Sequence, residues 1–165
     1  MNIESEHLVL RALTRGEAEV IVTEDRTGQS WAPDYPTAAD VGISAIALAG
    51  RVAFPSLELP WGLFVIVEKS SGRSIGGIGF KGVPNERSEI EIGYGVCPSQ
   101  QGHGVASEAL DALCEFSRGR VGAVVAETDL DNVASQRVLE KCDFHSVEAA
   151  ANLQRWRRDL GAVTP

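Results

Sequence analysis

The stretch EIEIGYGVCPSQQGHGVASEAL, residues 89–110, places an alternating pattern directly before a glycine-rich turn and a helical pattern. Over residues 89–96, isoleucine, tyrosine and valine occupy every second position, and glutamate or glycine occupies the others. This alternation predicts a strand with one apolar face. From Gly104 to Arg118, apolar residues recur at helical spacing, so a helix follows the turn. A strand joined in this way to a helix favours an α/β fold.

Elements of the same two kinds are predicted along the rest of the chain. Thr14 with Glu17, and Thr37 with Asp40, form capping-box patterns that each predict the start of a helix. Further strands are predicted at residues 7–13, 62–69, 74–82, 122–131, 144–150 and 153–160, and a further helix at residues 132–142. The order is one strand, two helices, three strands, a helix, a strand, a helix and two strands. This order describes a single mixed α/β domain spanning residues 1–165.

Gly93 and Gly95 interrupt the side chains of the alternating strand. Glycine inside a strand commonly marks a β-bulge or the close approach of another backbone. We therefore expect one of these two irregularities in the second half of the strand.

An acidic composition narrows the function classes. The 165 residues carry a formal net charge of −8, which argues against binding to nucleic acid or to an anionic membrane. The same charge favours a cationic substrate such as an amine. No apolar run approaches the roughly 18 residues of a membrane span, and the N-terminus lacks a signal-peptide pattern. The three cysteines match no zinc pattern, so we expect no metal, reduced thiols and a cytoplasmic protein.

The turn around Gly102 and Gly104 is suited to anions. Glycine lets backbone N–H groups approach a ligand, and the helix behind the turn offers free N–H groups. The glycines could also do no more than shape a tight turn. A dinucleotide site is a weaker alternative, because Gly102, Gly104 and Ser107 approximate the G-x-G-x-x-G spacing. That motif normally follows the first strand of its fold, whereas here several predicted strands precede it.

The segment QGHGVA, residues 101–106, resembles the pyrophosphate-binding signature of the Gcn5-related N-acetyltransferase (GNAT) family. Residues 89–110 resemble that family's fourth strand and third helix, and residues 127–144 resemble the strand and helix that follow. With residues 7–13 as the first strand, the resemblance covers nearly the whole chain. Within the family, the sequence is most similar to the ribosomal-protein N-terminal acetyltransferase (RimJ/RimL-like) branch. The resemblance implies a three-layer fold, with a mostly antiparallel twisted sheet of about 6–7 strands flanked by about 4 helices.

The resemblance implies acetyl-coenzyme A as co-substrate, bound without a metal. Its pyrophosphate is expected on the turn and the helix start. The Asn-x-x-Ser segment at Asn132 and Ser135 is expected to contact the cofactor as well. In the family, a backbone N–H of the preceding strand stabilises the oxyanion, and the same strand edge pairs with pantetheine. The expected cofactor-binding residues are Gly95, Val96, Gln101, Gly102, His103, Gly104, Val105, Ala106 and Asn132.

The resemblance also implies direct transfer of an acetyl group to a primary amine, either a protein N-terminus or a small molecule. Glu91 matches a strand glutamate that acts as base in some family members, with Glu89 or a water chain as the alternative. Ser135 falls where the related branch has a helix serine near the sulfur, so it is the candidate acid for the thiolate. Each residue also has a structural interpretation, Glu91 as an ion-pair partner and Ser135 as a residue that satisfies backbone groups.

Three features depart from the family pattern. Asp143 stands where the family commonly has glycine, so we expect a local backbone cost without a change of fold. Gln101 replaces the arginine common at its position, so phosphate binding relies more on backbone N–H groups. The tyrosines are Tyr35 and Tyr94 alone, so the catalytic tyrosine that many relatives place near the last helix has no counterpart there.

The acceptor is expected near the SWAPDYP segment and the last hairpin. Trp31 and Tyr35 are the candidate substrate residues, although both could instead pack beneath their loop. Arg155 and Arg157 share a strand face, either as contacts for an acidic acceptor or as solvated charges. The alternative function is a non-catalytic acyl-coenzyme A-binding module that acts as a sensor or partner protein. The oligomeric state stays open, with a homodimer through the sheet edge or the last hairpin as one option.

Overall fold

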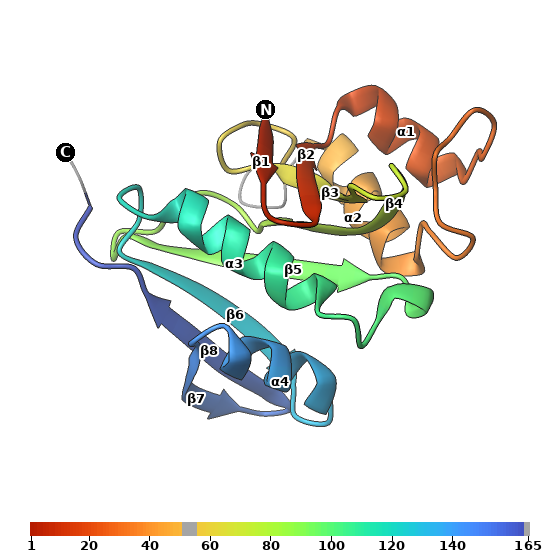
Figure 1. Cartoon of the computed structure of the whole chain (residues 1–165). Coiled ribbons are helices and arrows are strands. Elements are labelled where there is room, and N and C mark those ends of the chain that lie inside the picture. Colours follow the sequence, from red (N-terminus) through yellow and green to blue (C-terminus); the bar gives the residue numbers. More distant parts are fainter. Residues whose placement is uncertain (51–55, 164–165) are drawn as a thin grey trace.

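The computed structural model describes residues 1–50 and 56–163. These residues form eight strands and four α-helices (Figure 1). The strands are β1 (Asn2–Glu4), β2 (Leu8–Ala12), β3 (Leu63–Glu68), β4 (Ser74–Phe80), β5 (Glu89–Val96), β6 (Ala123–Asp129), β7 (His145–Ala150) and β8 (Leu153–Asp159). The helices are α1 (Arg15–Thr23), α2 (Ala38–Leu48), α3 (Val105–Ser117) and α4 (Val133–Lys141), and a 3₁₀ turn, η1 (Pro98–Gln100), follows β5.

The mixed α/β architecture expected from the sequence is confirmed, with one strand more than expected. The addition is β1, in which Asn2 lies opposite Arg11 and Glu4 lies opposite Val9 of β2. A segment of three residues is too short for a periodicity signal. It forms a strand because the edge of β2 offers it hydrogen-bonding partners.

All eight strands form one sheet, in the order β1-β2-β3-β4-β5-β6-β8-β7. Neighbouring strands are antiparallel except β5 and β6, which are parallel and are connected through α3, as parallel strands require a crossover. These two strands pair only from Glu89 opposite Ala123 to Glu91 opposite Val125. Beyond that point they diverge, and the sheet opens into two arms (Figure 1).

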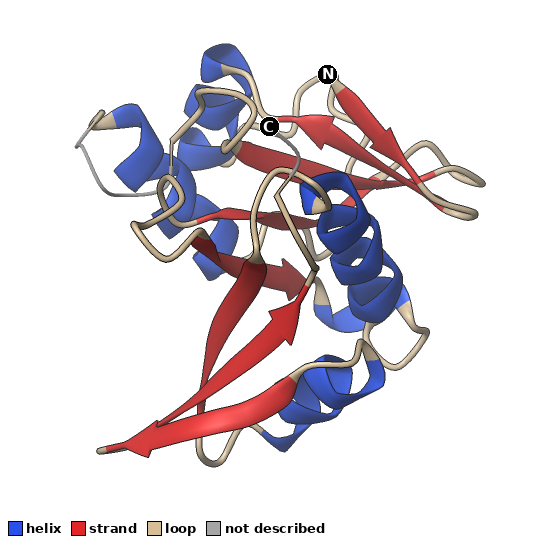
Figure 2. Cartoon of the chain, turned by 90° about the vertical axis from the view of Figure 1, so that its left-hand side faces the viewer, coloured by secondary structure: helices blue, strands red, loops and turns tan. Residues whose placement is uncertain are grey.

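Helices cover both faces of the sheet, with α1 and α2 on one side and α3 and α4 on the other (Figure 2). Leu110 and Leu113 of α3 are buried, as are Ile90 and Ile92 of β5 beneath that helix. Each such side chain contributes about 2 kcal/mol to folding through its burial. This packing holds β5 in position next to the point where the sheet divides.

Both predicted helix starts are capping boxes. On α1, the Glu17 N–H donates to the Thr14 hydroxyl at 3.3 Å, and the Thr14 N–H donates to the Glu17 carboxylate at 3.2 Å. On α2, the Asp40 N–H donates to the Thr37 hydroxyl at 3.3 Å, and the Thr37 N–H donates to the Asp40 carboxylate at 2.8 Å. The two boxes differ in burial, because Asp40 is only 6% exposed.

The irregularity expected at Gly93 and Gly95 is wrong. The pairing of β5 with β4 runs without a shift from Phe80 opposite Ile92 to Gly76 opposite Val96. A Cβ atom at Gly95 would meet no atom within 4 Å, and one at Gly93 would meet only a side chain. Gly95 therefore borders open space and Gly93 lies against the Lys81 side chain, so a bulge explains neither glycine.

Two smaller expectations are confirmed. Asp143 has a φ of 59°, in the left-handed region where glycine is common. The cysteines are unpaired and buried, namely Cys97, Cys114 and Cys142.

Candidate functional site

The divergence of β5 and β6 leaves a groove between the two strands, with a volume of about 340 Å³. Its walls come from β5, from the second half of β6, and from the start of α4. The lining residues are Lys81, Ile92, Gly93, Tyr94, Ala126, Glu127, Thr128, Asp129, Asn132, Ser135, Leu139 and Leu153.

The backbone of β5 presents hydrogen-bonding groups to this groove. Just after β5, the Cys97 N–H donates to the Ile75 carbonyl at 2.9 Å. Because an antiparallel strand bonds a given neighbour through alternate residues, the odd-numbered positions of β5 face β4. The N–H of Gly95 is therefore directed to β4, whereas those of Tyr94 and Val96 lie on the open edge. Of the expected pair Gly95 and Val96, only Val96 directs its N–H to the groove.

The start of α3 has no side-chain cap. Gly102 and Gly104 have φ values of 77° and 81°, a conformation that favours glycine. The N–H groups of Val105 and Ala106 belong to the first turn, where the helix itself offers no acceptor. The turn therefore presents N–H groups and the positive end of the helix dipole, an arrangement that binds phosphate.

Side chains fix this turn from two directions. The Gln101 amide donates to the Val96 carbonyl at 3.1 Å, which ties the turn to the end of β5. The N–H and the hydroxyl of Ser99 both donate to Asp34, each at 2.7 Å. His103 is exposed and lines a surface hollow beside the β1–β2 loop. Gln101 thus holds the turn against the end of β5, whereas His103 does not line the groove.

The start of α4 forms the wall opposite β5. The Ser135 N–H donates to the Asn132 side chain at 3.1 Å, so Asn132 is the N-cap of α4. The Tyr94 hydroxyl donates to the Ser135 carbonyl at 3.3 Å. Burial raises the pKa of Tyr94 to about 12, so the phenol is protonated at neutral pH. The sequence pattern predicts for Tyr94 only a position on the apolar face of its strand, because a contact between distant segments leaves no local signal.

Glu91 forms an ion pair at the edge of the groove. Its carboxylate accepts a hydrogen bond from Lys81 at 2.7 Å, and both side chains are partly exposed. Lys81 lines the groove, whereas Glu91 is not among the lining residues and reaches the groove only through Lys81. A proton could therefore pass from the groove to Glu91 through a water molecule rather than by direct contact.

Glu89, the alternative base, is held more firmly. It is 8% exposed, and it pairs with Arg157 and, at 3.5 Å, with Arg155. Burial raises the pKa of Glu89, but hydrogen bonds from Asn85 and Arg157 and the charges of both arginines outweigh burial and hold that pKa below its usual value. Glu89 is thus a carboxylate whose charge is paired with two arginines. Arg155 and Arg157 therefore have an ionic partner within the chain.

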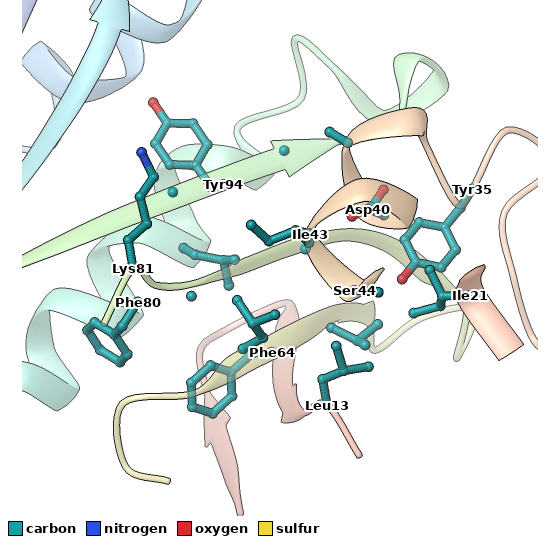
Figure 3. A pocket seen from close by; sticks show the side chains of 18 residues that line it. Leu13, Ile21, Tyr35, Asp40, Ile43, Ser44, Phe64, Phe80, Lys81 and Tyr94 are labelled. Atoms are coloured by element: carbon teal, nitrogen blue, oxygen red, sulfur yellow. The ribbon is translucent and has the colours of Figure 1, made fainter. Parts of the chain in front are cut away.

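A second cavity lies beneath α2, with a volume of about 160 Å³ and a mostly apolar lining. Figure 3 shows Asp40 and Tyr35 at one end of it and Lys81 and Tyr94 at the other. Lys81, Gly93 and Tyr94 also line the groove. The cavity and the groove therefore meet at the middle of β5.

The two candidate substrate residues lie differently with respect to this cavity. Tyr35 lines it, and Trp31 does not. The ring of Trp31 packs edge-on against Tyr35 with 5.6 Å between centroids, and Arg26 lies over the Trp31 ring. Trp31 thus supports the wall that Tyr35 forms.

Within the described residues, no group of three or more His, Cys, Asp or Glu side chains could hold a metal ion. No helix in this part of the chain is both long enough and apolar enough to cross a membrane.

Comparison with known proteins gives concordant matches. A family model described as an acetyltransferase (GNAT) domain matches residues 7–145. The uncharacterized N-acetyltransferase YjdG of Bacillus subtilis (strain 168) is 35% identical over 95 residues, which is 56% of this chain and 56% of that relative's length. The uncharacterized N-acetyltransferase YoaA of the same strain is 28% identical over 150 residues, which covers 86% of this chain and 81% of that one.

Among solved structures, RimL, a ribosomal alpha-N-protein acetyltransferase in complex with coenzyme A, is similar with a TM-score of 0.68. The two sequences are 20% identical, and the match covers 98% of this chain and 99% of that chain. This likeness shows a common fold.

Proposed function

This chain belongs to the acetyltransferase (GNAT) domain family, and we propose that it transfers an acetyl group from acetyl-coenzyme A directly to a primary amine. The observation that carries the proposal is the groove between β5 and β6, whose β5 edge leads to the uncapped start of α3. An open strand edge next to a free helix N-terminus suits a donor with amides in one part and a pyrophosphate in another.

In this proposal the donor lies along β5. The pantetheine amides pair with the open edge at Tyr94 and Val96, as an added strand would. The pyrophosphate sits on the N–H groups of residues 102–106 at the start of α3. Gln101 contributes by holding the turn against β5, and Asn132 contributes by fixing the start of α4 beside the donor.

The chain's own groups then supply three functions. A backbone N–H on the open edge of β5 stabilises the negative charge that develops on the carbonyl oxygen. Glu91 takes the proton from the attacking amine through a water molecule. As the carbon–nitrogen bond forms and the carbon–sulfur bond breaks, the thiolate takes a proton from the hydroxyl of Ser135, which lines the groove, and water returns a proton to the serine oxygen. Tyr94 places a second hydroxyl in the same groove.

The acceptor approaches through the cavity beneath α2, because that cavity meets the groove at Gly93 and Tyr94. RimL is a ribosomal alpha-N-protein acetyltransferase. For this chain we propose a protein N-terminus or a small amine as the acceptor class. The buried, unpaired thiols support a cytoplasmic setting.

Thermal-shift measurements with acetyl-coenzyme A, free coenzyme A and NAD test the donor. We expect both coenzyme A compounds to stabilise the protein and NAD to leave its melting temperature unchanged. Stabilisation by NAD alone would contradict the proposal. Thiol release with a panel of amines, with acetylated products identified by mass spectrometry, then tests turnover. Stabilisation by acetyl-coenzyme A without amine-dependent thiol release would indicate the non-catalytic binding module instead.

A further inference from the structure

The cavity beneath α2 is lined by polar groups that have no partner in the described chain. Asp40, Ser44 and Tyr35 line it and are 6%, 1% and 1% exposed. Thr37 donates twice to Oδ2 of Asp40, at 2.8 and 2.7 Å, and no described group donates to Oδ1. Neither the Ser44 nor the Tyr35 hydroxyl has a hydrogen-bond partner among these residues. Every fully buried side-chain N or O atom in the described chain has a hydrogen-bond partner. These unpartnered oxygens are therefore accessible, and their residues line the cavity.

Glycine forms the floor of this cavity. Gly77 lies opposite Gly95 and Gly79 lies opposite Gly93, and all four line the cavity. A Cβ atom at Gly77 would lie 2.7 Å from Oδ1 of Asp40, so that oxygen rests directly over the floor. A Cβ atom at Gly95 would meet nothing within 4 Å. The cross-strand pair of Gly77 and Gly95 therefore keeps open a space into which the carboxylate projects.

Asp40 is the charge in this cavity for which the described residues provide no ionic partner. The other charged residue that lines the cavity is Lys81, which is bonded to Glu91 at 2.7 Å. Burial raises the pKa of Asp40, although the hydrogen bonds from Thr37 act in the opposite direction. A buried carboxylate of this kind costs free energy until a cation reaches it.

The size of the cavity limits the occupant. Its volume of about 160 Å³ is close to the roughly 150 Å³ of an engineered cavity that holds benzene. The walls include Ile43, Phe64 and Ile78, which are apolar. A compact group with an apolar body and one cationic end fits both the volume and the lining.

We propose that this cavity is the acceptor subsite, and that Asp40 selects a primary ammonium group carried on a compact apolar body. The inference rests on the proposed acetyl transfer and specifies the substrate class of that site. An ammonium has three N–H donors, and Oδ1 of Asp40 with the hydroxyls of Ser44 and Tyr35 offers three acceptors. The bound ammonium attacks only after it passes one proton to Glu91 through water, which leaves the neutral amine. A free amine and the first residue of a peptide share this chemistry. The glycine floor joins the subsite to the groove. Asp40 lies over Gly77, and Gly77 pairs with Gly95 of β5, the strand along which the donor is proposed to lie.

Asp40→Asn tests the charge, because the amide oxygen can still accept the bonds from Thr37. Glu17→Gln is the matched control, since Glu17 holds the same position in the capping box of α1 and does not line the cavity. The substrates are benzene-sized primary amines in one arm and tripeptides with a free N-terminus in the other. We expect Asp40→Asn to lower kcat/KM for the amine about tenfold or more, mainly through KM. The control and the affinity for acetyl-coenzyme A should stay within about twofold of wild type.

Gly95→Ala tests the space, because its methyl group would enter the cavity without touching another atom. It should lower kcat/KM for amines that fill the cavity more than for methylamine. If Asp40→Asn lowers turnover of the primary amines or of the tripeptides, the inference is supported. The affected arm shows whether the ammonium belongs to a small molecule or to a peptide N-terminus. Equal kcat/KM in wild type and Asp40→Asn overturns it.

If wild type releases no thiol with any amine, the proposed function fails, and calorimetry of amine binding still decides the role of Asp40. Weaker amine binding by Asp40→Asn than by wild type then supports the subsite. Equal affinity overturns it.

Discussion

The hydroxyl of Tyr94 on β5 lies 3.3 Å from the carbonyl oxygen of Ser135 on α4, so one hydrogen bond spans the groove between the strand and the helix. Both residues line that groove, and a donor placed there would meet two hydroxyl groups. The pKa of about 12 keeps the phenol protonated. The groove therefore contains two hydroxyl groups, and substitution tests which of them protonates the thiolate in the proposed reaction.

Ser135→Ala should lower kcat about a hundredfold if the serine hydroxyl protonates the thiolate. Binding of acetyl-coenzyme A should be unchanged, because the cap at Asn132 uses the backbone N–H of Ser135 and not its side chain. Thiol-release kinetics give kcat, and calorimetry gives the affinity. Normal turnover with intact binding would remove Ser135 from the mechanism.

Tyr94→Phe is the companion variant. Loss of one hydrogen bond across the groove should weaken acetyl-coenzyme A binding by a few fold, equivalent to about 1 kcal/mol. Under the Ser135 assignment, kcat changes little. A large loss of kcat in Tyr94→Phe together with normal turnover in Ser135→Ala would reverse the assignment and make Tyr94 the acid.

Glu91→Gln should flatten the acidic limb of the pH profile of kcat/KM. The reason is that a deprotonated carboxylate is no longer needed to accept the proton of the amine, and activity at neutral pH should fall about a hundredfold. Glu89→Gln on the same strand face is the matched comparison, measured at a temperature where the variant is folded. A profile that flattens in Glu89→Gln but not in Glu91→Gln would exchange the two assignments.

The ion pairs of Glu89 predict a pH-dependent contribution to stability. The folded-state pKa of Glu89 lies below its unfolded value, so the contribution is fully present above the unfolded pKa and is lost as the pH falls through the folded pKa. Glu89→Gln should lower the free energy of unfolding by about 1–3 kcal/mol at pH 7. Urea unfolding at pH 7 and near pH 3.5 measures this difference, which should shrink at the lower pH. A cost that is equal at both values would mean that the carboxylate charge contributes nothing.

Local sequence patterns predicted the elements well because the interactions behind them join near neighbours. The capping boxes at Thr14 and Thr37 and the cap at Asn132 each link residues three apart. The patterns did not predict relationships between distant segments. The sequence marked Asp40 as a helix-start residue, and nothing near it in the chain shows that its second oxygen faces Gly77. For the same reason the pairing of β8 between β6 and β7 and the divergence of β5 from β6 came only from the structure.

Asp40→Asn should stabilise the free protein at neutral pH. Burial raises the pKa of Asp40 in the folded chain, so the folded chain holds this proton more tightly than the unfolded chain does. Stability then falls as the pH rises from the unfolded pKa through the folded one, and it stays lower above that range. Asparagine does not titrate and keeps the bonds from Thr37. The variant should therefore melt at the same temperature as wild type or higher at pH 7, with the difference shrinking below about pH 4.

Asp34→Asn provides a control of opposite sign. The hydrogen bond from Ser99 lowers the pKa of Asp34, so this carboxylate contributes stability above its unfolded pKa, and its replacement should lower the melting temperature at pH 7.

A primary amine that occupies the cavity supplies the cation that Asp40 lacks among the described residues, so it should raise the melting temperature of wild type more than that of Asp40→Asn. If Asp40→Asn melts below wild type at pH 7 and the amine shifts both proteins equally, the carboxylate serves the helix cap and not a ligand.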